Sequence, residues 1–435
     1  FLNFDMNASL FHSHGKPVML QELYVQDISP PGLAEAQGWW LIGRGYNLLT
    51  YFTYSYYYEG KRAGLPLVFG MFDKEGNAYP CYPSFKQFSA DLRQFHATYD
   101  APSLRRVEPR VAVLMSDDMS LANILESGGA TWNALGVQGH NGSYWLTERN
   151  GYAVEFVNDD SLHGLDRESV LIVPWSHVLR ASTTHRVLRF AKRGGTVLID
   201  GAFAQFSDCY RAHTPGPGYG ADEDLGIRCS GLDRDENAIT VGNGTPIASR
   251  GIAHDLQLSD DVTVLHNDTH GRPAVVERRL GRGRVIWLLT ALGPMNRTRA
   301  PDTQALDLWG GLLATSGLRP RVRFSAHEIH VAEAVDLDHG GKGLKSTVPL
   351  PDVSARIRDD RELFVFAVSF FGASEGEIVV ELPAGDVTVT DALSGETIVS
   401  TRQGDQLHVP LKLAAFGSRV VRIVSTSGSK LFRKW

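Results

Sequence analysis

The sequence predicts an α/β protein in three parts, and three patterns support this. Residues 17–24 and 46–54 have the composition of short apolar strands and flank a helical stretch. From Arg110 onward, apolar strands alternate with amphipathic helices, whereas beyond 319 strand patterns follow one another without a helix. A chain of 435 residues is also too long for one core. We expect domains at 1–100, 109–318 and 319–435.

The first part begins with the apolar peptide PVMLQE (17–22). Residues 30–45, PPGLAEAQGWWLIGRG, have proline at the entrance and glycine at the exit, which predicts a helix. A crossover of this length favours parallel pairing of the strands on either side of it, in a sheet or a barrel. Residues 83–99 predict a second helix with one apolar stripe, and 101–109, APSLRRVEP, have the composition of a linker. The stripe comprises Phe85, Phe88, Leu92, Phe95 and Tyr99.

The second part has a doubly wound pattern. Helical stretches such as STTHRVLRFAKRG (182–194) alternate with apolar strands, and RGRVIWLLTAL (282–292) with the helix at 301–317 completes the series. Residues 201–247 interrupt it with a Gly/Pro-rich insertion in which we expect no regular element. The other strands are VAVLM, AVEFV, VLIVPW and TVLIDG.

The third part predicts a small antiparallel β-sandwich. Its strands are short and are separated by turn residues. They are ELFVFAVSFF, EIVVELP, VTVTDAL, QLHVPLK and SRVVRIV.

Composition excludes several classes of partner. The 43 Lys and Arg residues against 49 Asp and Glu residues give a net charge of 43 − 49 = −6. Since no long basic run is present either, we expect neither nucleic acid nor an anionic membrane as a partner. No window reaches the ~18 apolar residues of a spanning helix. Three widely spaced cysteines argue against a disulfide framework and a CxxC metal site, and favour a reduced compartment, the cytoplasm. We expect no cofactor and no metal.

The chemistry is predicted at the carboxyl end of the first strand, because loops converge there in parallel α/β proteins. Glu22 ends this strand, and the second strand leads into the aromatic cluster YFTYSYYYEG (51–60). Aromatic rings pack against the C–H face of a sugar, while phenols and carboxylates bind its hydroxyl groups. A retaining glycosidase would use Glu22 as nucleophile, opposite a second carboxyl roughly 5 Å away. The expected substrate-binding residues are Tyr24, Tyr54, Tyr56 and Glu59.

Each of these residues also has a structural interpretation. A single glutamate at a strand end commonly forms an ion pair or lies on the surface. Tyrosines at alternating positions commonly pack in the core and at its rim. The residue pattern alone leaves both interpretations open.

PVMLQE, the helix after it and GYNLLTYFTYSYYYEG (45–60) resemble the last two barrel strands of the glycoside hydrolase family 42 β-galactosidases. The resemblance implies that Glu22 is the nucleophile of a partial (β/α)8 barrel. It places Tyr54 where the family usually has a substrate-facing tryptophan, a departure that bears on galactose specificity. FKQFSADLRQFH (85–96) is similar to the last barrel helix of the family.

The second and third parts also resemble this family. RVAVLM, the stretch from VLIVPWSH to GGTVLIDG, and RRLGRGRVIWL are similar to its trimerisation domain, which has a glutamine-amidotransferase-like fold. The resemblance therefore implies a homotrimer. The strands beyond 319 match the small C-terminal β-domain of the family in position and size.

One departure concerns the barrel itself. A complete (β/α)8 barrel needs about 250 residues, whereas about 100 precede the second part, and the Asn-Glu pair that carries the family's acid/base is missing; Asn3 and Asp5 do not replace it. We therefore expect a separate chain with the N-terminal barrel half, or a truncated sequence. The predicted function is a retaining, β-galactosidase-like hydrolase. The alternative is a non-catalytic assembly or carbohydrate-binding subunit that oligomerises a separate catalytic chain.

Other candidate sites have simpler explanations. His12 and His14 lack a third metal ligand at suitable spacing, which favours a solvated turn. Ser176 and His177 lack the glycines of a nucleophile elbow, so we predict a loop there, with a serine hydrolase as a third alternative. Acid pairs that follow predicted strands are explained by helix capping. They are Asp117–Asp118 and Asp159–Asp160.

Overall fold

The protein is a mixed α/β structure with several sheets, seen here as a computed structural model. The chain divides into two compact units, Phe1–Glu108 with Pro320–Trp435, and Pro109–Arg319. The first unit thus contains residues predicted to form the first and the third domains. The residues described are 18–24, 29–52, 57–62, 65–108, 110–127, 134–166, 169–242, 244–297, 301–326, 332–334, 344–346, 351–370, 372–426 and 432.

The first unit opens with a parallel strand pair. β1 (Val18–Tyr24) and β2 (Tyr46–Phe52) pair in parallel and are connected by α2 (Leu33–Gly43), which confirms the predicted strand, helix and strand. A short antiparallel hairpin follows, formed by β3 (Tyr57–Arg62) and β4 (Leu65–Phe69). The second half of the tyrosine-rich segment therefore contributes a strand of its own.

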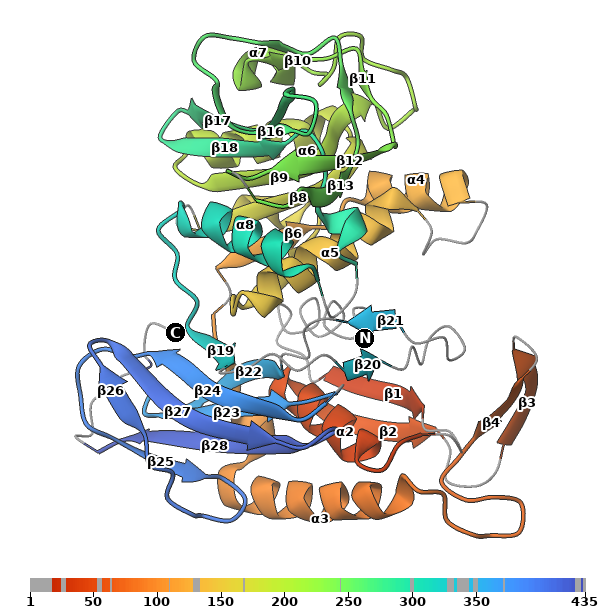
Figure 1. Ribbon diagram of the computed structural model, residues 1–435, viewed down its shortest axis with the longest axis vertical. Helices are drawn as coiled ribbons and strands as arrows, with labels where there is room; N and C mark the ends of the chain where they lie inside the picture. Colours follow the sequence, from red (N-terminus) through yellow and green to blue (C-terminus); the bar gives the residue numbers. More distant parts are fainter. Residues whose placement is uncertain are drawn as a thin grey trace. The chain divides into compact units, whose positions relative to one another are not determined.

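Helices α2 and α3 (Tyr82–Tyr99) share one aromatic core. Trp39 is fully buried, and its ring meets Phe88 at 5.4 Å and Phe95 at 5.6 Å, both edge to face. Phe95 also packs edge to face on Phe364 of β23 (Glu362–Val368) at 5.6 Å. Figure 1 shows these helices, red and orange, against the blue C-terminal strands. The predicted apolar stripe of α3 is confirmed, because its buried residues are Phe88, Phe95 and Tyr99.

The remaining strands of this unit form two antiparallel sheets. One has the order β25-β28-β23-β22-β5 and the other β19-β24-β27-β26, while β20 pairs with β21. All five strands predicted beyond 319 are present. The bounds are β5 (Arg105–Arg106), β19 (Val322–Ala326), β20 (Ala332–Ala334), β21 (Leu344–Ser346), β22 (Asp352–Arg358), β24 (Ser374–Glu381), β25 (Val387–Asp391), β26 (Thr401–Gln403), β27 (Gln406–Leu413) and β28 (Ser418–Ser425).

The predicted linker at 101–109 is wrong in part. After the 3-10 turn η1 (Ala101–Ser103), β5 pairs with β22 through Arg105↔Ile357 and Arg106↔Arg356 and becomes the edge of the five-stranded sheet. Two arginines give no local strand signal. Their pairing depends on a strand about 250 residues away, and such a partner cannot be read from neighbouring residues.

The second unit is built on a nine-stranded sheet of order β13-β12-β16-β17-β18-β9-β8-β6-β7. The five strands from β18 to β7 are parallel, and the other four extend the sheet in antiparallel pairing. The bounds are β6 (Val111–Leu114), β7 (Val154–Val157), β8 (Val170–Val178), β9 (Thr196–Phe206), β12 (Glu236–Thr240), β13 (Ile247–Arg250), β16 (Thr263–Asp268), β17 (Pro273–Leu280) and β18 (Gly283–Leu288).

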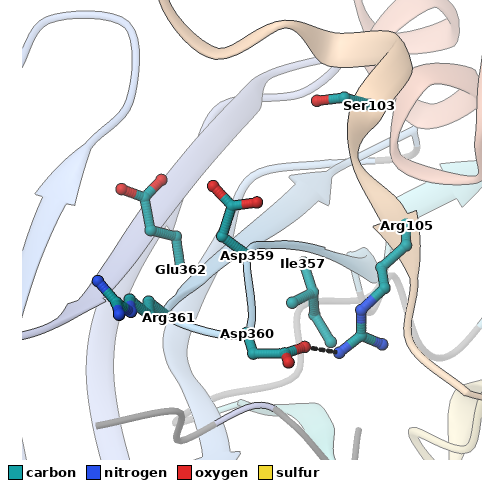
Figure 2. A pocket seen from close by; sticks show the side chains of 7 residues that line it. All are labelled: Ser103, Arg105, Ile357, Asp359, Asp360, Arg361 and Glu362. Carbon is teal, nitrogen blue, oxygen red and sulfur yellow. Dashed lines mark hydrogen bonds and ion pairs between the residues drawn. The ribbon is translucent and has the colours of Figure 1, made fainter. Parts of the chain in front are cut away.

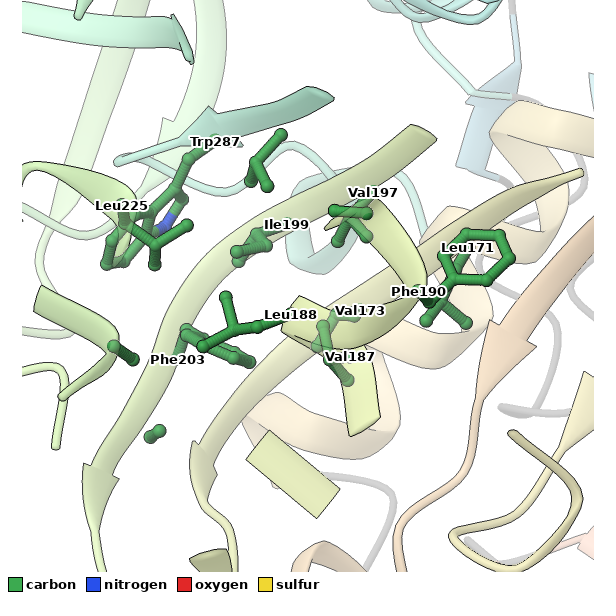
Figure 3. Packing of buried hydrophobic residues seen from close by; sticks show 14 of the residues in the cluster. Leu171, Val173, Val187, Leu188, Phe190, Val197, Ile199, Phe203, Leu225 and Trp287 are labelled. Atoms are coloured by element: carbon green, nitrogen blue, oxygen red, sulfur yellow. The ribbon is translucent and has the colours of Figure 1, made fainter. Parts of the chain in front are cut away.

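Helices cover the parallel strands, which explains why these strands are continuous apolar runs. α6 packs on β9 and β18, whereas α5 packs on β6, β7 and β8. Figure 3 shows the core under α6, where Leu188 lies near Val173 and Ile199 of the strands. Phe190 lies near Leu171, and Trp287 lies near Leu225. The other elements are α4 (Asp117–Ser127), α5 (Leu135–Arg149), η3 (Ser161–Gly164), α6 (Ala181–Lys192), α7 (Ala221–Leu225), β10 (Ile227–Arg228), β11 (Gly231–Leu232), β14 (Ala253–His254), β15 (Gln257–Leu258), η4 (Gly293–Met295) and α8 (Thr303–Ala314).

Two expectations for this unit are wrong. The Gly/Pro-rich stretch at 201–247 does contain regular elements, because β9 continues to Phe206, α7 follows, and β12 joins the main sheet. Its glycines and prolines lie largely in the turns between them. Ser176 and His177 belong to β8 rather than to a loop, and both are buried. The register of β8 against β9 shifts at Pro174, as expected where a proline interrupts a central strand.

Candidate functional site

The backbone around Glu22 departs from regular pairing. Leu20 pairs with Leu49 and Leu23 pairs with Tyr51, so β1 contains one residue more than β2 between these two pairs. Gln21 and Glu22 therefore lie in a β-bulge near the carboxyl end of β1. Bulges are frequent next to active sites, because they change the direction in which a side chain points.

The predicted site residues are only partly placed. Glu22 and Tyr24 belong to β1 and Glu59 to β3, whereas the side chains of all three lie outside the described part of the structure. Tyr54 and Tyr56 lie outside the described residues altogether, as do His12 and His14. The roles predicted for these residues therefore stay predictions.

Tyr51, in the same aromatic cluster, has a structural role. Its hydroxyl donates a 2.6 Å hydrogen bond to the carbonyl oxygen of Ala34 in α2, and its ring meets Phe85 edge to face at 4.9 Å. Withdrawal from solvent, aided by the nearby Cys81, raises the pKa of Tyr51. This tyrosine packs β2 onto the helices and has no hydroxyl proton left to donate to a sugar.

The two-stranded sheet has one covered face and one open face. Val18 and Leu20 are buried beside α2, whereas the paired residues Met19 and Leu48 are 53% and 54% exposed. Among the described residues, no strand pairs with the outer edge of β1 or of β2. Parallel sheets are normally larger than two strands and covered on both faces.

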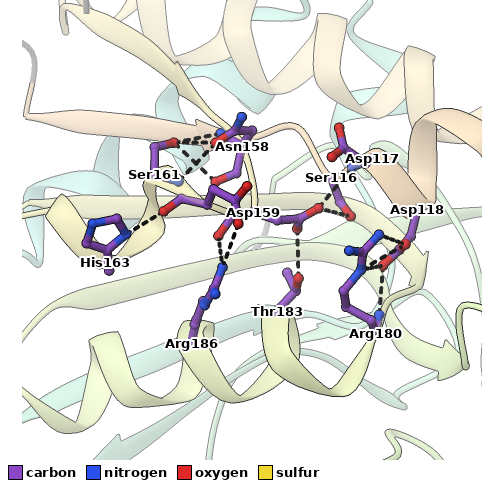
Figure 4. A network of polar contacts seen from close by, with 11 residues as sticks. Ser116, Asp117, Asp118, Asn158, Asp159, Ser161, His163, Arg180, Thr183 and Arg186 are labelled. Carbon is purple, nitrogen blue, oxygen red and sulfur yellow. Dashed lines mark hydrogen bonds and ion pairs between the residues drawn. The ribbon is translucent and has the colours of Figure 1, made fainter.

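A second candidate lies at the carboxyl ends of β6, β7 and β8. The chain passes from β7, on one side of β6, to β8 on the other, and such a reversal is where open α/β sheets bind ligands. Figure 4 shows the acidic residues there. Asp118 accepts from Nε and the backbone N–H of Arg180, both at 2.9 Å, while Asp159 accepts from the Asp117 N–H at 3.0 Å and from Thr183 at 2.8 Å.

These contacts confirm helix capping for Asp159. Asp159, after β7, caps the first turn of α4, which follows β6; Asp118, in α4, accepts from the residue that precedes α6. Asp159 thus caps the helix that follows a neighbouring strand, and Asp118 holds the N-cap residue of α6. Since their oxygens are already occupied, this edge is a structural network.

The pair Ser176–His177 is not a hydrolase site. Ser176 is 1% exposed and donates to the carbonyl oxygen of Pro174 at 2.7 Å. Nε2 of His177 instead contacts Glu126 at 2.6 Å, and Arg234 contacts the other oxygen of Glu126 at 2.7 Å. Burial alone would raise the pKa of Glu126, yet His177 and Arg234 hold it below its usual value. The serine-hydrolase alternative is therefore wrong.

Figure 2 shows a pocket of about 620 Å³ in the first unit. Its described lining residues include no aromatic ring on which a sugar could stack, and Arg105 forms an ion pair with Asp360 at 2.6 Å within the pocket. Within the described ranges, no group of three or more His, Cys, Asp or Glu could hold a metal ion. The lining residues are Ser103, Arg105, Ile357, Asp359, Asp360, Arg361 and Glu362.

Asp200 is a fully buried acid of β9 with a structural role. It accepts hydrogen bonds from the backbone N–H groups of Leu292 at 2.8 Å and Gly293 at 2.9 Å. Burial raises the pKa of Asp200 to about 6, although these donors oppose the shift. The carboxylate fastens η4 to the end of the parallel sheet.

A pH dependence of stability follows from this shift. Between the unfolded pKa of about 3.8 and the folded pKa of about 6, the folded state binds more protons. The free energy of unfolding is therefore expected to fall as pH rises through this window, by up to about 3 kcal/mol from this group. Urea unfolding at pH 4.5 and 7 should show this loss in the wild type and a smaller one in Asp200→Asn. Equal losses would contradict it.

Residues 141–299 match the family model of the β-galactosidase trimerisation domain. The resemblance to family 42 β-galactosidases is confirmed. No curated protein sequence matches the chain.

Solved structures extend the likeness to the fold of almost the whole chain. A catalytic mutant of a family 42 β-galactosidase from G. stearothermophilus superposes with a TM-score of 0.70 at 18% identity, over 97% of this chain and 55% of that one. A β-galactosidase from Bacillus circulans gives 0.67 at 16% identity, over 97% and 58%. An α-L-fucosidase from Paenibacillus thiaminolyticus gives 0.57 at 14% identity, over 92% and 58%.

These values show that the chain has the fold of part of the family 42 β-galactosidases. The chain spans little more than half the length of these enzymes. No described helix is long and apolar enough to cross a membrane.

Proposed function

We propose that this chain is the C-terminal part of a retaining, β-galactosidase-like glycoside hydrolase in which Glu22 is the nucleophile. One observation carries the proposal: the parallel pair β1–β2 has a bulge at Gln21–Glu22, two edges with which no described strand pairs, and an exposed apolar face. Such a pair needs further parallel strands, and a family 42 barrel would supply them. Glu22 would then lie at the carboxyl-end face of the barrel, where the chemistry of these barrels takes place.

The proposed reaction has two steps. The Glu22 carboxylate attacks the anomeric carbon while a second carboxylic acid protonates the leaving oxygen, which forms a covalent glycosyl-enzyme. The second carboxyl then takes a proton from water, the water displaces Glu22, and the sugar leaves with its configuration retained. Tyr24, Tyr54, Tyr56 and Glu59 bind the sugar hydroxyl groups. The second carboxyl belongs to the rest of the barrel, which a separate chain or a longer form of this chain contributes.

The sugar is proposed as a β-linked, galactose-like residue. The fold does not decide this point, because an α-L-fucosidase shares it. Tyr54, in the place of a tryptophan, presents a smaller ring with a hydroxyl group. A panel of aryl β-glycosides would establish the preference.

The alternative is a non-catalytic subunit that assembles a separate catalytic chain as a homotrimer. The match of 141–299 to a trimerisation domain favours it, as does the occupied polar network at the carboxyl ends of β6, β7 and β8. Native mass spectrometry separates the two proposals. A stoichiometric partner with the missing barrel strands indicates a split enzyme, whereas a trimer without a partner indicates a scaffold.

The catalytic proposal is tested by trapping the intermediate. The complete enzyme is incubated with a 2-deoxy-2-fluoro-β-galactoside that has a good leaving group, because fluorine slows the second step more than the first. Peptide mass spectrometry should find the sugar on Glu22. An adduct on another carboxylate would reassign the nucleophile.

A further inference from the structure

Helix α4 presents apolar side chains to solvent. Leu121, Ile124 and Leu125 are 55%, 52% and 62% exposed, and their i, i+3, i+4 spacing places them on one stripe. The opposite face, with Met119 and Ala122, is buried against the body of the unit. A surface helix normally has the reverse polarity on its outer face.

Leu121, Ile124 and Leu125 form one exposed apolar stripe, which we call the α4 patch.

The α4 patch is followed along the helix by a paired polar group. Glu126 is shared between His177 at 2.6 Å and Arg234 at 2.7 Å. An apolar centre beside paired polar groups is the anatomy of a protein–protein interface.

We propose that the α4 patch is a contact between copies of this chain. A second copy is the occupant because the unit that contains α4 also contains the segment that matches a trimerisation domain. Val264 and Met295, which are also exposed in this unit, lie on separate elements, as single exposed residues commonly do. The inference rests on the proposed assembly role and specifies the surface that performs it.

The test introduces charge into the α4 patch of the full chain. Ile124→Glu and Leu125→Glu place carboxylates where the second copy would exclude water, so about a hundredfold loss of association or more is expected for the double variant. Sedimentation velocity and native mass spectrometry should then find monomers at concentrations at which the wild type is oligomeric. Thermal unfolding at high dilution should change little, because both side chains face solvent.

Two controls make the result specific. Val264→Glu, in the same unit, and Val399→Glu, 82% exposed in the other, add the same charge to single exposed valines and should leave the oligomer intact. An unchanged oligomer in the double variant would overturn the α4 patch alone. A monomeric wild type would overturn both the patch and the proposed assembly role. Dissociation in the double variant and in both controls would show general charge repulsion and also overturn the patch.

Discussion

Glu22→Gln is expected to lower kcat by at least about a thousandfold in the enzyme with a complete barrel. The amide has nearly the shape of the carboxylate but is a poor nucleophile, and it cannot stabilise positive charge at the anomeric carbon. Because the change is nearly isosteric, we expect substrate binding to be largely preserved. Single-turnover kinetics with an aryl β-galactoside measure the first step directly.

A second variant identifies the role of Glu22 rather than its importance. Glu22→Gly leaves space for a small anion, so azide should restore turnover of an activated aryl glycoside. Azide would attack from the side of the missing carboxylate and yield the α-glycosyl azide. A β-azide would indicate loss of the acid/base instead, and no rescue together with normal wild-type labelling elsewhere would exclude Glu22 from the chemistry.

Glu75→Gln is the matched control for the charge change. Glu75 is 58% exposed in a turn of the same unit and contacts only Lys74 among the described ion pairs. Its replacement should leave kcat and KM unchanged. Glu59→Gln, by contrast, removes a proposed sugar ligand, so we expect a higher KM and a smaller loss of kcat than for Glu22→Gln.

Local sequence patterns were sufficient to predict the buried residues wherever burial depends on a single helix or strand. The spacing of Phe88, Phe95 and Tyr99 follows the helical period, and all three residues of α3 are buried. The apolar run of β8 is buried along its whole length, as expected for a strand covered on both faces. In such cases burial depends on periodicity within the element, and periodicity is visible in the sequence.

Features that depend on distant partners could not be predicted. β5 consists of two arginines and exists because β22 offers it an edge. β12 joins a sheet whose order cannot be deduced from composition. The capping of α4 by Asp159 requires β7 to lie beside β6, and this pairing is not visible in the sequence of either strand.

The candidate site also has features that the sequence predicts and features that it does not. The position of Glu22 near the end of β1 was predicted from the length of an apolar run and is confirmed for the backbone. The bulge at Gln21–Glu22 was not predicted, because register belongs to the pair of strands and not to either sequence alone. Neighbours in sequence were also misleading for Ser176 and His177, since adjacent residues of a strand point to opposite faces.

Gly142→Ala is expected to destabilise the second unit by about 3 kcal/mol, against the usual effect of this substitution in a helix. Gly142 lies inside α5, where alanine would ordinarily be favoured by about 1 kcal/mol. Here a Cβ atom would overlap the carbonyl group of Gly293 in η4. That backbone cannot retreat easily, because the N–H group of Gly293 is bound by the buried carboxylate of Asp200.

Gly311→Ala is the matched control. Gly311 lies inside α8, and a Cβ atom there would meet nothing within 4 Å, so we expect stabilisation by about 1 kcal/mol. Urea unfolding should therefore separate the two variants by about 4 kcal/mol. If Gly142→Ala changed the free energy of unfolding as Gly311→Ala does, the close approach of α5 and η4 would be wrong. Combining Gly142→Ala with Asp200→Asn tests the cause. Because Asp200→Asn loosens η4, the double variant should lose less free energy of unfolding than the two single variants lose together.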